Sequence, residues 1–402
     1  MANLEMVRHL AISTPSKIVL LVADGLGGLP DPRTGNTELE TARTPNLDRL
    51  AGMSMCGLTT PVAPGITPGS APSHLALFGY DPIEYEIGRG ILEALGVDFD
   101  IQERDVAARG NFCTIDANGI VTDRRAGRIS TEKNIELCKL LSRKVSIPGI
   151  ELFVVPVKEH RFVVVFRGDG LRGELTDSDP QKEGKSPRLV EALVPEASRT
   201  AALANDFAAQ ARKALTDSHP ANMMLLRGFS KHPDLPQMSE CFKLKAAAIA
   251  VYPMYRGLAK VVGMTALPSG NDLAGEIEAL KRNYDSYDFF YVHFKKTDSS
   301  GEDGDFQAKA KAEEDLDAAI PQILALNPDV LMVAGDHSTP AMLKGHSWHP
   351  VPFLLYSKWV RRDKVTKFCE SACAGGLLGT FSATDVMTLA LANALKLEKY
   401  GA

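Results

Sequence analysis

Three short apolar runs, far apart along the chain, share one pattern. Residues 18–23 (IVLLVA), 289–294 (FFYVHF) and 330–334 (VLMVA) are almost continuously hydrophobic and lack polar–apolar alternation. Strands that are buried on both faces of a parallel sheet show this pattern. We therefore predict three central strands of a parallel sheet, with a further strand over 351–356.

The texture of the chain changes near residue 87. Apolar runs such as FVVVF at 162–166 alternate there with helical patterns, including an alanine-rich stretch at 197–215. This mixture predicts a second, smaller α/β (α+β) domain inserted into the first. We expect the inserted domain to span 87–265 and the main domain to consist of 1–86 and 266–402.

Composition adds bounds rather than a function. A chain of 402 residues exceeds one simple core, so two domains are expected. The net charge of −5 argues against nucleic acid or a membrane surface as a partner. The N-terminus lacks a secretory pattern, no apolar run reaches about 20 residues, and the six cysteines have no metal-finger spacing. These features predict a cytoplasmic protein with reduced thiols.

An acidic residue follows each of the three predicted central strands. Asp24, Asp298 and Asp336 stand at or just beyond the strand ends. The carboxyl ends of parallel strands share one edge, where α/β sheets bind ligands. Any one of these aspartates could merely cap a turn, but three together predict a converging cluster.

Further metal-binding residue types lie close to these aspartates. His337 adjoins Asp336, Glu302 follows Asp298 by four residues, and His346 and His349 come shortly after. Carboxylates combined with imidazoles suit a pair of divalent cations such as Mn²⁺ or Zn²⁺. A single histidine is more often only a hydrogen-bonding partner, so that alternative stays open for each residue alone.

Ser70 lies in a loop of small residues, within PGITPGSAPSHLALFGYDP at 64–82, just before a predicted helix. A helix N-terminus favours an anion, and a serine hydroxyl there could accept and release a phosphoryl group. Two cations about 4 Å apart would clamp that group and lower the pKa of the hydroxyl. The plainer alternative is a loop that caps an ordinary helix.

Basic residues cluster in the middle of the chain. The segment DRRAGR at 123–128 places three arginines within five residues, as a clamp for phosphate or carboxylate or as a solvated turn. The candidate substrate-binding residues are Arg109, Arg124, Arg125, Arg128, Arg227, Lys260 and Lys296.

Seven motifs resemble one family. They are ADGLGG at 23–28, TPNLD at 44–48, PGS…HLALFGYDP at 68–82, DRRAGR at 123–128, KTD..GEDGDF at 296–306, GDHSTP at 335–340 and HS..PVP at 346–352. In this order, over nearly the whole chain, they resemble the archaeal-type 2,3-bisphosphoglycerate-independent phosphoglycerate mutases of the alkaline phosphatase superfamily.

This resemblance implies an alkaline-phosphatase-like, mostly parallel sheet flanked by helices, with an inserted substrate-binding domain. It implies an isomerase of glycolysis and gluconeogenesis that interconverts 3-phosphoglycerate and 2-phosphoglycerate through a phosphoserine at Ser70, without 2,3-bisphosphoglycerate. Asp24, Ser70, Asp336 and His337 correspond to the ligands of one metal ion, and Asp298 and His346 to those of the other. We expect Mn²⁺ first, with Mg²⁺, Co²⁺ or Zn²⁺ as alternatives, and a monomer or homo-oligomer.

The chain departs from the family pattern at two positions. Glu302 replaces a histidine in GEDG, and His349 replaces an acid in HSWHPVP. We hypothesise that Glu302 ligates in place of the histidine and that His349 restores the local charge or itself reaches the metal. An added carboxylate favours harder ions such as Mn²⁺ or Mg²⁺ over Zn²⁺.

Three alternative functions are compatible with the same family of motifs. A metal-dependent phosphatase would pass the phosphoryl group to water, and a related mutase would act on another small phosphate ester. A non-catalytic relative would have no need of Ser70. The arginine-rich inserted domain favours a mutase over a phosphatase, because it could hold glycerate while the phosphoserine exists.

Overall fold

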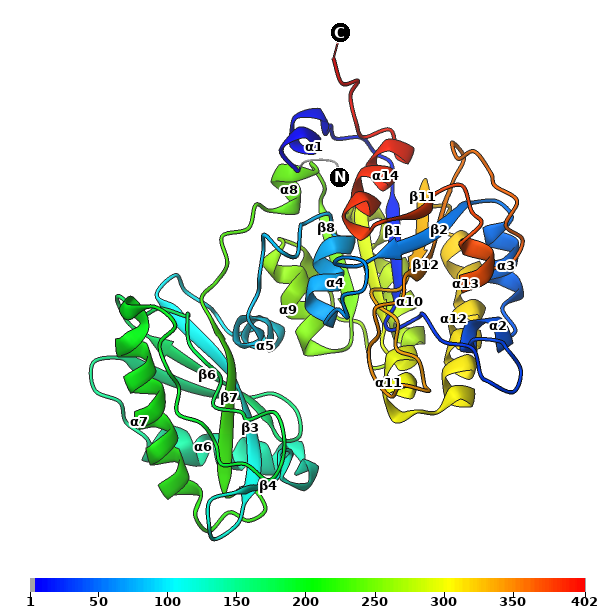
Figure 1. The fold of residues 1–402 in the computed structure, drawn as a ribbon. Helices are drawn as coiled ribbons and strands as arrows, with labels where there is room; N and C mark the ends of the chain where they lie inside the picture. The colour runs from blue at the N-terminus through cyan, green and yellow to red at the C-terminus, as the bar shows by residue number, and fades with distance from the viewer. Residues whose placement is uncertain (1–3, 402) are drawn as a thin grey trace. The chain divides into compact units, whose positions relative to one another are not determined.

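The computed structural model describes residues 4–401 and divides into two compact units (Figure 1). The larger unit contains the chain up to Glu86 and from Leu235 onward, and the smaller unit is Ile87–Asp234. Both contain helices and strands, so the predicted α/β class is confirmed.

The larger unit is built on an eight-stranded sheet of order β13-β2-β12-β11-β1-β10-β8-β9. β12 runs antiparallel to its neighbours β11 and β2, and the other neighbouring pairs are parallel. The strands are β1 (Ile18–Ala23), β2 (Met55–Thr60), β8 (Ala246–Ala250), β9 (Thr265–Ala266), β10 (Phe289–Phe294), β11 (Val330–Ala334), β12 (Val351–Ser357) and β13 (Gly379–Ser382). The three predicted central strands are confirmed and lie side by side.

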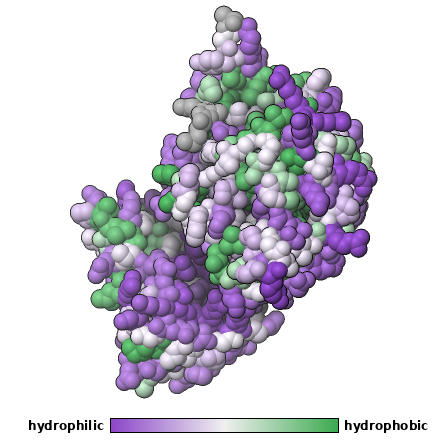
Figure 2. Space-filling view, turned by 45° about the vertical axis from the view of Figure 1, so that its right-hand side comes forward, coloured by the Kyte–Doolittle hydropathy of each residue, from purple (hydrophilic) through white to green (hydrophobic). Residues whose placement is uncertain are grey.

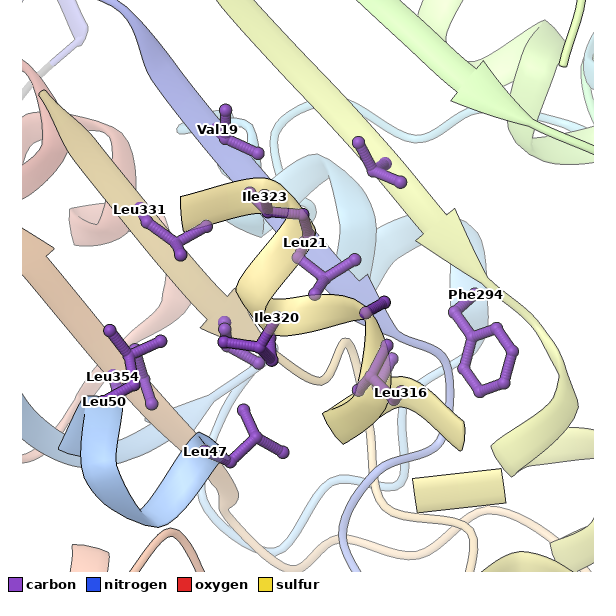
Figure 3. Close-up of a cluster of buried hydrophobic side chains, with 14 of the residues drawn as sticks. Val19, Leu21, Leu47, Leu50, Phe294, Leu316, Ile320, Ile323, Leu331 and Leu354 are labelled. Atoms are coloured by element: carbon purple, nitrogen blue, oxygen red, sulfur yellow. The ribbon is translucent and has the colours of Figure 1, made fainter. Parts of the chain in front are cut away.

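Helices cover both faces of this sheet (Figure 1). They are α1 (Leu4–Leu10), α2 (Glu38–Thr41), α3 (Pro45–Ala51), α4 (Ser70–Leu77), α8 (Met238–Cys241), α9 (Pro253–Val261), α10 (Leu273–Asn283), α11 (Lys296–Asp303), α12 (Phe306–Leu324), α13 (Glu370–Cys373) and α14 (Val386–Asn393). In the close-up of the core, Leu316, Ile320 and Ile323 of α12 lie beside Leu21 and Leu331 of the sheet (Figure 3). Each such buried side chain stabilises the fold by about 1.5–3 kcal/mol, so α12 is firmly attached to the strands.

A sharp turn joins α11 to α12. Gly304 ends α11 in the left-handed region, with φ of 75°, which a residue with a Cβ adopts only with strain. Asp305 then caps α12 by accepting a hydrogen bond from the main-chain nitrogen of Ala308 at 2.9 Å. The turn fixes α11, which follows β10, against the longer helix.

The smaller unit is an antiparallel sheet of order β4-β3-β6-β5, with β7 paired to β3. Its core lies where α6 and α7 pack on one face of that sheet, and α5 contacts β3 and β7. The elements are α5 (Arg89–Gly96), β3 (Asp105–Ile115), β4 (Val121–Asp123), α6 (Thr131–Lys144), β5 (Glu151–Pro156), β6 (Arg161–Arg167), α7 (Ser198–Leu215) and β7 (Met223–Ser230).

The second junction between the units differs from the expected one. Residues 235–265 were assigned to the inserted domain, but they group with the larger unit. The physical reason is strand pairing, because β8 lies parallel to β10 with Ala246 opposite Phe289. The inserted unit therefore ends at Asp234 rather than at residue 265.

The visible surface carries hydrophilic residues interspersed with hydrophobic ones (Figure 2). Large exposed hydrophobic side chains include Trp348 and Trp359. Between residues 4 and 401, no helix combines the length and apolar character that crossing a membrane requires.

Candidate active site

The three acidic strand ends meet at one edge of the larger sheet. β1 lies between β11 and β10, with Ala23 opposite Phe294 and Val22 opposite Ala334. Asp24 directly follows β1, and Asp336 follows β11 after one glycine. Asp298 lies in the first turn of α11, which comes after β10. The sheet register therefore places all three carboxylates together.

Two groups of side chains have the composition of metal sites. One is Asp24, Asp336 and His337, and the other is Asp298, His337 and His346. Within each group, the candidate ligand atoms lie within 4.8 Å of one another. The imidazoles of His337 and His346 are stacked with their centroids 3.6 Å apart. A pair of cations could thus be held side by side.

Both histidines present Nε2 to these groups because Nδ1 is engaged elsewhere. His346 Nδ1 donates to the main-chain oxygen of Pro68 at 2.9 Å, and His337 Nδ1 donates to Thr339 Oγ1 at 3.0 Å. His346 Nε2 lies 3.6 Å from Asp298 Oδ1. A hydrogen bond at one ring nitrogen that orients the other is the usual arrangement of a ligating histidine.

Unpartnered oxygens show that the first group fits a cation. Among the described residues, buried Asp24 Oδ1 and Asp336 Oδ2 accept no well-formed hydrogen bond, although imidazole nitrogens lie 3.1–3.3 Å from them. Burial of an unpaired carboxylate oxygen is costly, and a divalent cation would remove that cost. Burial lowers the pKa of His337, but the neighbouring carboxylates of Asp336 and Asp24 raise it to about 9 overall. Without a cation, the imidazolium can offset part of the negative charge.

The other oxygen of Asp24 is heavily hydrogen-bonded. Asp24 Oδ2 accepts from the hydroxyl of Tyr255, from His293 Nε2 at 3.1 Å and from Lys295 Nζ at 2.9 Å. Lys295 Nζ also donates to Asp298 Oδ2 at 2.5 Å, so one ammonium links both groups. Burial opposes ionisation of Asp24, but Lys295, His293 and His337 hold its pKa well below the usual value.

Ser70 is the first residue of α4, after the N-cap residue Gly69. Its Oγ lies 3.2 Å from His337 Nε2, next to both groups. Its main-chain oxygen accepts from His74 Nδ1 at 2.8 Å, and that nitrogen lies 3.1 Å from Asp336 Oδ2. The hydroxyl therefore stands between a helix N-terminus and the acidic cluster.

Two threonines orient the acidic side chains. Thr339 Oγ1 donates to Asp298 Oδ1 at 2.7 Å, and Thr297 Oγ1 donates to the main-chain oxygen of Asp24 at 2.5 Å. The main-chain nitrogen of Gly25 donates to Asp336 Oδ1 at 3.0 Å. These bonds connect the segments that follow β1, β10 and β11.

Besides Ser70, four sequence-predicted residues of the larger unit belong to neither group. Within the described part of the chain, neither includes Glu302, which is exposed on α11, nor His349, which bonds Ser347 Oγ at 3.0 Å and stacks on Trp348. Lys296 is exposed and pairs with Asp315 at 3.1 Å. Lys260 is half-buried on α9. The lysine that contacts the acids is Lys295, the neighbour of Lys296.

The smaller unit presents arginines on the sheet face opposite α6 and α7. Arg109 of β3 and Arg227 of β7 are directly opposite each other in the register, and Arg161 of β6 is paired with Asn111. Like charges placed opposite each other are unfavourable. Burial lowers the pKa of Arg109 to about 10, and Glu93 lies 3.5 Å away and partly offsets this.

The DRRAGR segment divides between the interior and the surface. Arg124 forms a bidentate pair with buried Asp179, at 3.1 and 2.6 Å, and Arg227 lies 3.8 Å from the same carboxylate. Arg125 and Arg128 are exposed. Arg124 therefore has a structural partner, and the exposed pair is free to meet solvent.

Several residues at the site had not been predicted. His74, Tyr255, His293 and Lys295 contact the acidic cluster, and Arg161 joins the arginine face. The sequence offered one indication that His293 belongs to the site, since this histidine interrupts the apolar run FFYVHF. Tyr255 gave none, because it is separated from Asp24 by 231 residues.

Fold and site together define a class: an α/β protein with a candidate two-cation centre beside a serine at the carboxyl edge of its sheet. A sequence profile described as 2,3-bisphosphoglycerate-independent phosphoglycerate mutase matches residues 51–222. Curated relatives from Thermotoga maritima and Thermus thermophilus, each named "Probable 2,3-bisphosphoglycerate-independent phosphoglycerate mutase", are 55% and 52% identical. These alignments cover 99% and 98% of both chains. The chain belongs to the family of 2,3-bisphosphoglycerate-independent phosphoglycerate mutases, as its motifs had indicated.

Solved structures of similar fold cover nearly the whole chain. A cofactor-independent phosphoglycerate mutase from Thermoplasma acidophilum is 32% identical, with a TM-score of 0.71 over 94% of this chain and 100% of that one. A protein from Pyrococcus horikoshii is 28% identical, with a TM-score of 0.84 over 97% and 100%. The similarity extends through both units.

Proposed function

We propose that the protein interconverts 3-phosphoglycerate and 2-phosphoglycerate through a phosphoserine at Ser70, without 2,3-bisphosphoglycerate. The observation that carries the proposal is the position of Ser70 Oγ, 3.2 Å from His337 Nε2 and next to two carboxylate–imidazole groups. Family membership supports the same reaction.

The cation-binding roles follow from the two groups. Asp24, Asp336 and His337, with Ser70, would hold one divalent ion, and Asp298 and His346 the other. When bound, such ions act as Lewis acids, lower the pKa of a nearby hydroxyl and offset phosphoryl charge. Two unpartnered carboxylate oxygens support this assignment.

The remaining chemistry belongs to the side chains. The Ser70 oxygen attacks phosphorus and gives its proton to solvent, and the ester oxygen of the substrate leaves and takes up a proton from solvent to become a hydroxyl. The N–H groups at the start of α4 stabilise the negative charge on the phosphoryl oxygens. In the second half, the other hydroxyl of glycerate attacks the phosphoserine, and Ser70 regains its proton. Each half forms one P–O bond and breaks one.

Arginines of the smaller unit suit the substrate anion. We assign binding of the glycerate carboxylate to Arg109, Arg227 and Arg161, with Arg125 and Arg128 as further contacts. Guanidinium groups bind carboxylates and phosphates bidentately, and a bound anion would relieve the repulsion between Arg109 and Arg227. Arg124 contributes by holding Asp179 beside Arg227.

The metal is proposed to be Mn²⁺, with Mg²⁺, Co²⁺ or Zn²⁺ as alternatives. A carboxylate-rich donor set favours the harder ions. Glu302 and His349 remain candidate ligands that would have to turn toward the groups, since Glu302 is exposed and His349 bonds Ser347. Reconstitution of metal-free protein with each ion, followed by an activity measurement, ranks the four ions.

A cytoplasmic location of the protein stays a prediction.

A phosphatase acting on the same ester is the second candidate, since identical residues could pass the phosphoryl group to water. The arginine face favours the mutase, because holding dephosphorylated glycerate matters only if the phosphoryl group returns to it.

The test is an assay of 3-phosphoglycerate coupled to enolase, with Mn²⁺ and without bisphosphoglycerate. Wild-type protein should give signal, and Ser70→Ala should abolish it. Ser73→Ala is the matched control, because Ser73 on the same helix donates only to the main-chain oxygen of Gly69. Phosphate release that exceeds isomer formation would replace the mutase with the phosphatase, and an active Ser70→Ala would refute the nucleophile.

A further inference from the structure

A fully buried lysine lies behind the candidate active site. Lys309 of α12 has no exposed surface, and its Nζ donates to the main-chain oxygens of Gly27 at 2.8 Å and Thr339 at 2.9 Å. Lysines are rarely buried completely, because desolvation of the ammonium is costly. None of the reaction steps proposed above uses this residue.

The two carbonyl groups belong to the two loops that carry most of the candidate ligands. Gly27 lies in the loop that follows β1 and begins at Asp24, and Thr339 lies in the loop that contains Asp336 and His337. The loops are also joined directly, because the main-chain nitrogen of Thr339 donates to the oxygen of Gly27 at 3.0 Å. One ammonium group therefore contacts both ligand-bearing loops.

Two glutamates, buried Glu38 and half-buried Glu370, accept hydrogen bonds from main-chain nitrogens of the same loops. Glu38 accepts from the main-chain nitrogens of Leu29 at 3.2 Å and Ala341 at 2.7 Å. Glu370 accepts from the main-chain nitrogen of Gly28 at 2.8 Å. Lys309 binds main-chain carbonyls and the glutamates bind main-chain N–H groups, so each loop is held by the lysine and by at least one glutamate.

The position of Lys309 is itself fixed. Its helix is attached to the sheet through Leu316, Ile320 and Ile323 (Figure 3). At its other end, the turn at Gly304 joins α12 to α11, which carries Asp298. Lys309 thus relates three ligand-bearing segments to one rigid helix.

We propose that Lys309 is a positioning residue, which sets the spacing of the Asp24 loop and the Asp336–His337 loop before a cation binds. The proposal rests on the metal centre proposed above. Residues that orient ligands from outside a metal site typically change metal affinity by about 10–100-fold when they are replaced.

The test compares Lys309→Met with a matched control, Lys396→Met. Lys396 is also fully buried and donates to a main-chain oxygen, that of Thr14, which precedes β1 at the end opposite Asp24. Mn²⁺ binding to the metal-free proteins is measured by titration calorimetry, and their stability by urea unfolding. Both variants should lose stability, but only Lys309→Met should bind Mn²⁺ more weakly, by about 10-fold or more.

Unchanged Mn²⁺ affinity in folded Lys309→Met would overturn the proposal and leave Lys309 a purely structural residue. An equal loss of affinity in Lys396→Met would overturn it as well, since the effect would then be global. A wild-type protein that binds no divalent cation would instead refute the proposed metal centre.

Hydrogen exchange of the metal-free wild type tests the inference even if Lys309→Met does not fold. Segments 24–29 and 336–341 should be protected before any cation is added. The exposed residues Lys182, Glu183, Lys185 and Ser186 are the internal reference for fast exchange, and Gly184 is left out because its amide donates to the main-chain oxygen of Val121 at 2.9 Å. If the two loops exchange as fast as that reference, Lys309 does not preset them and the proposal fails.

Discussion

His160 of the smaller unit is a buried histidine surrounded by positive charge. Burial, followed by the fields of Arg161, Arg109, Arg125 and Arg128, lowers its pKa to about 3. Its Nδ1 has no hydrogen-bond partner among residues 4–401. The imidazole is therefore neutral in the folded protein, whereas in the unfolded chain it titrates near 6.5.

This difference predicts a loss of stability in acid. The depressed pKa contributes stability that is fully present above about pH 6.5 and is lost as the pH falls towards 3, because the unfolded chain takes up the proton first. Between pH 7 and 5 the free energy of unfolding should fall by about 2 kcal/mol because of this group.

Urea unfolding of wild type and His160→Asn at both pH values measures that cost. The variant, which cannot take up this proton, should lose about 2 kcal/mol less than wild type between pH 7 and 5. Equal losses in the two proteins would show that His160 is charged in the folded state.

At the same scale, sequence could predict acids but not their partners. Asp24, Asp298 and Asp336 stand beside apolar strands, so topology alone places them at one edge. Lys295 and Lys296 are neighbours in sequence, yet Lys295 bonds two buried acids and Lys296 pairs with a surface acid. One residue of helical rotation decides between them, and a linear pattern does not reveal the rotation.

Among the elements, β3 and β7 form a strand pair with an unfavourable placement of two like charges. Arg109 and Arg227 stand opposite each other on one face, where neutral side chains would pair more favourably. Such a conflict is typical of a binding surface. Removal of one of these two arginine charges should therefore weaken substrate binding while the free energy of unfolding changes little.

Arg227→Gln should raise KM for 3-phosphoglycerate by about 10-fold or more, because a charged hydrogen bond to the substrate anion is lost. The free energy of unfolding should stay within about 1 kcal/mol of wild type, since relief of the like-charge pair offsets lost packing. Steady-state kinetics and urea unfolding check both. An unchanged KM would remove Arg227 from the substrate site.

The strands that sequence predicted best are those with uninterrupted apolar runs. β1, β10 and β11 have the expected bounds because burial on both faces leaves no ambiguity. The run at β8 is equally apolar, AAAIA, but no acid follows it to mark the same edge. Its pairing with β10 is a long-range contact, so the apolar run alone does not reveal which unit it joins.

For the whole molecule, the smaller unit has the features of an insertion that folds independently. It has its own core between α6, α7 and the sheet. Its two ends lie together, because Gly88 packs against Ser230 with no room for a Cβ. Closely spaced ends are typical of inserted domains.

A fragment of residues 87–234 should therefore unfold cooperatively on its own, as seen by circular dichroism in urea. A fragment of 87–265 should be less soluble, because it exposes the apolar strand β8 without its partner β10. If only the longer fragment folds, the boundary belongs at residue 265 after all.

The order of strands in the larger sheet also has a consequence during biosynthesis. Asp24 leaves the ribosome early, but its neighbours in space, from β10, β11 and the loop of His346, are translated more than 260 residues later. The inserted unit is complete long before them. A nascent or prematurely terminated polypeptide therefore lacks several residues of the proposed metal centre beside Ser70.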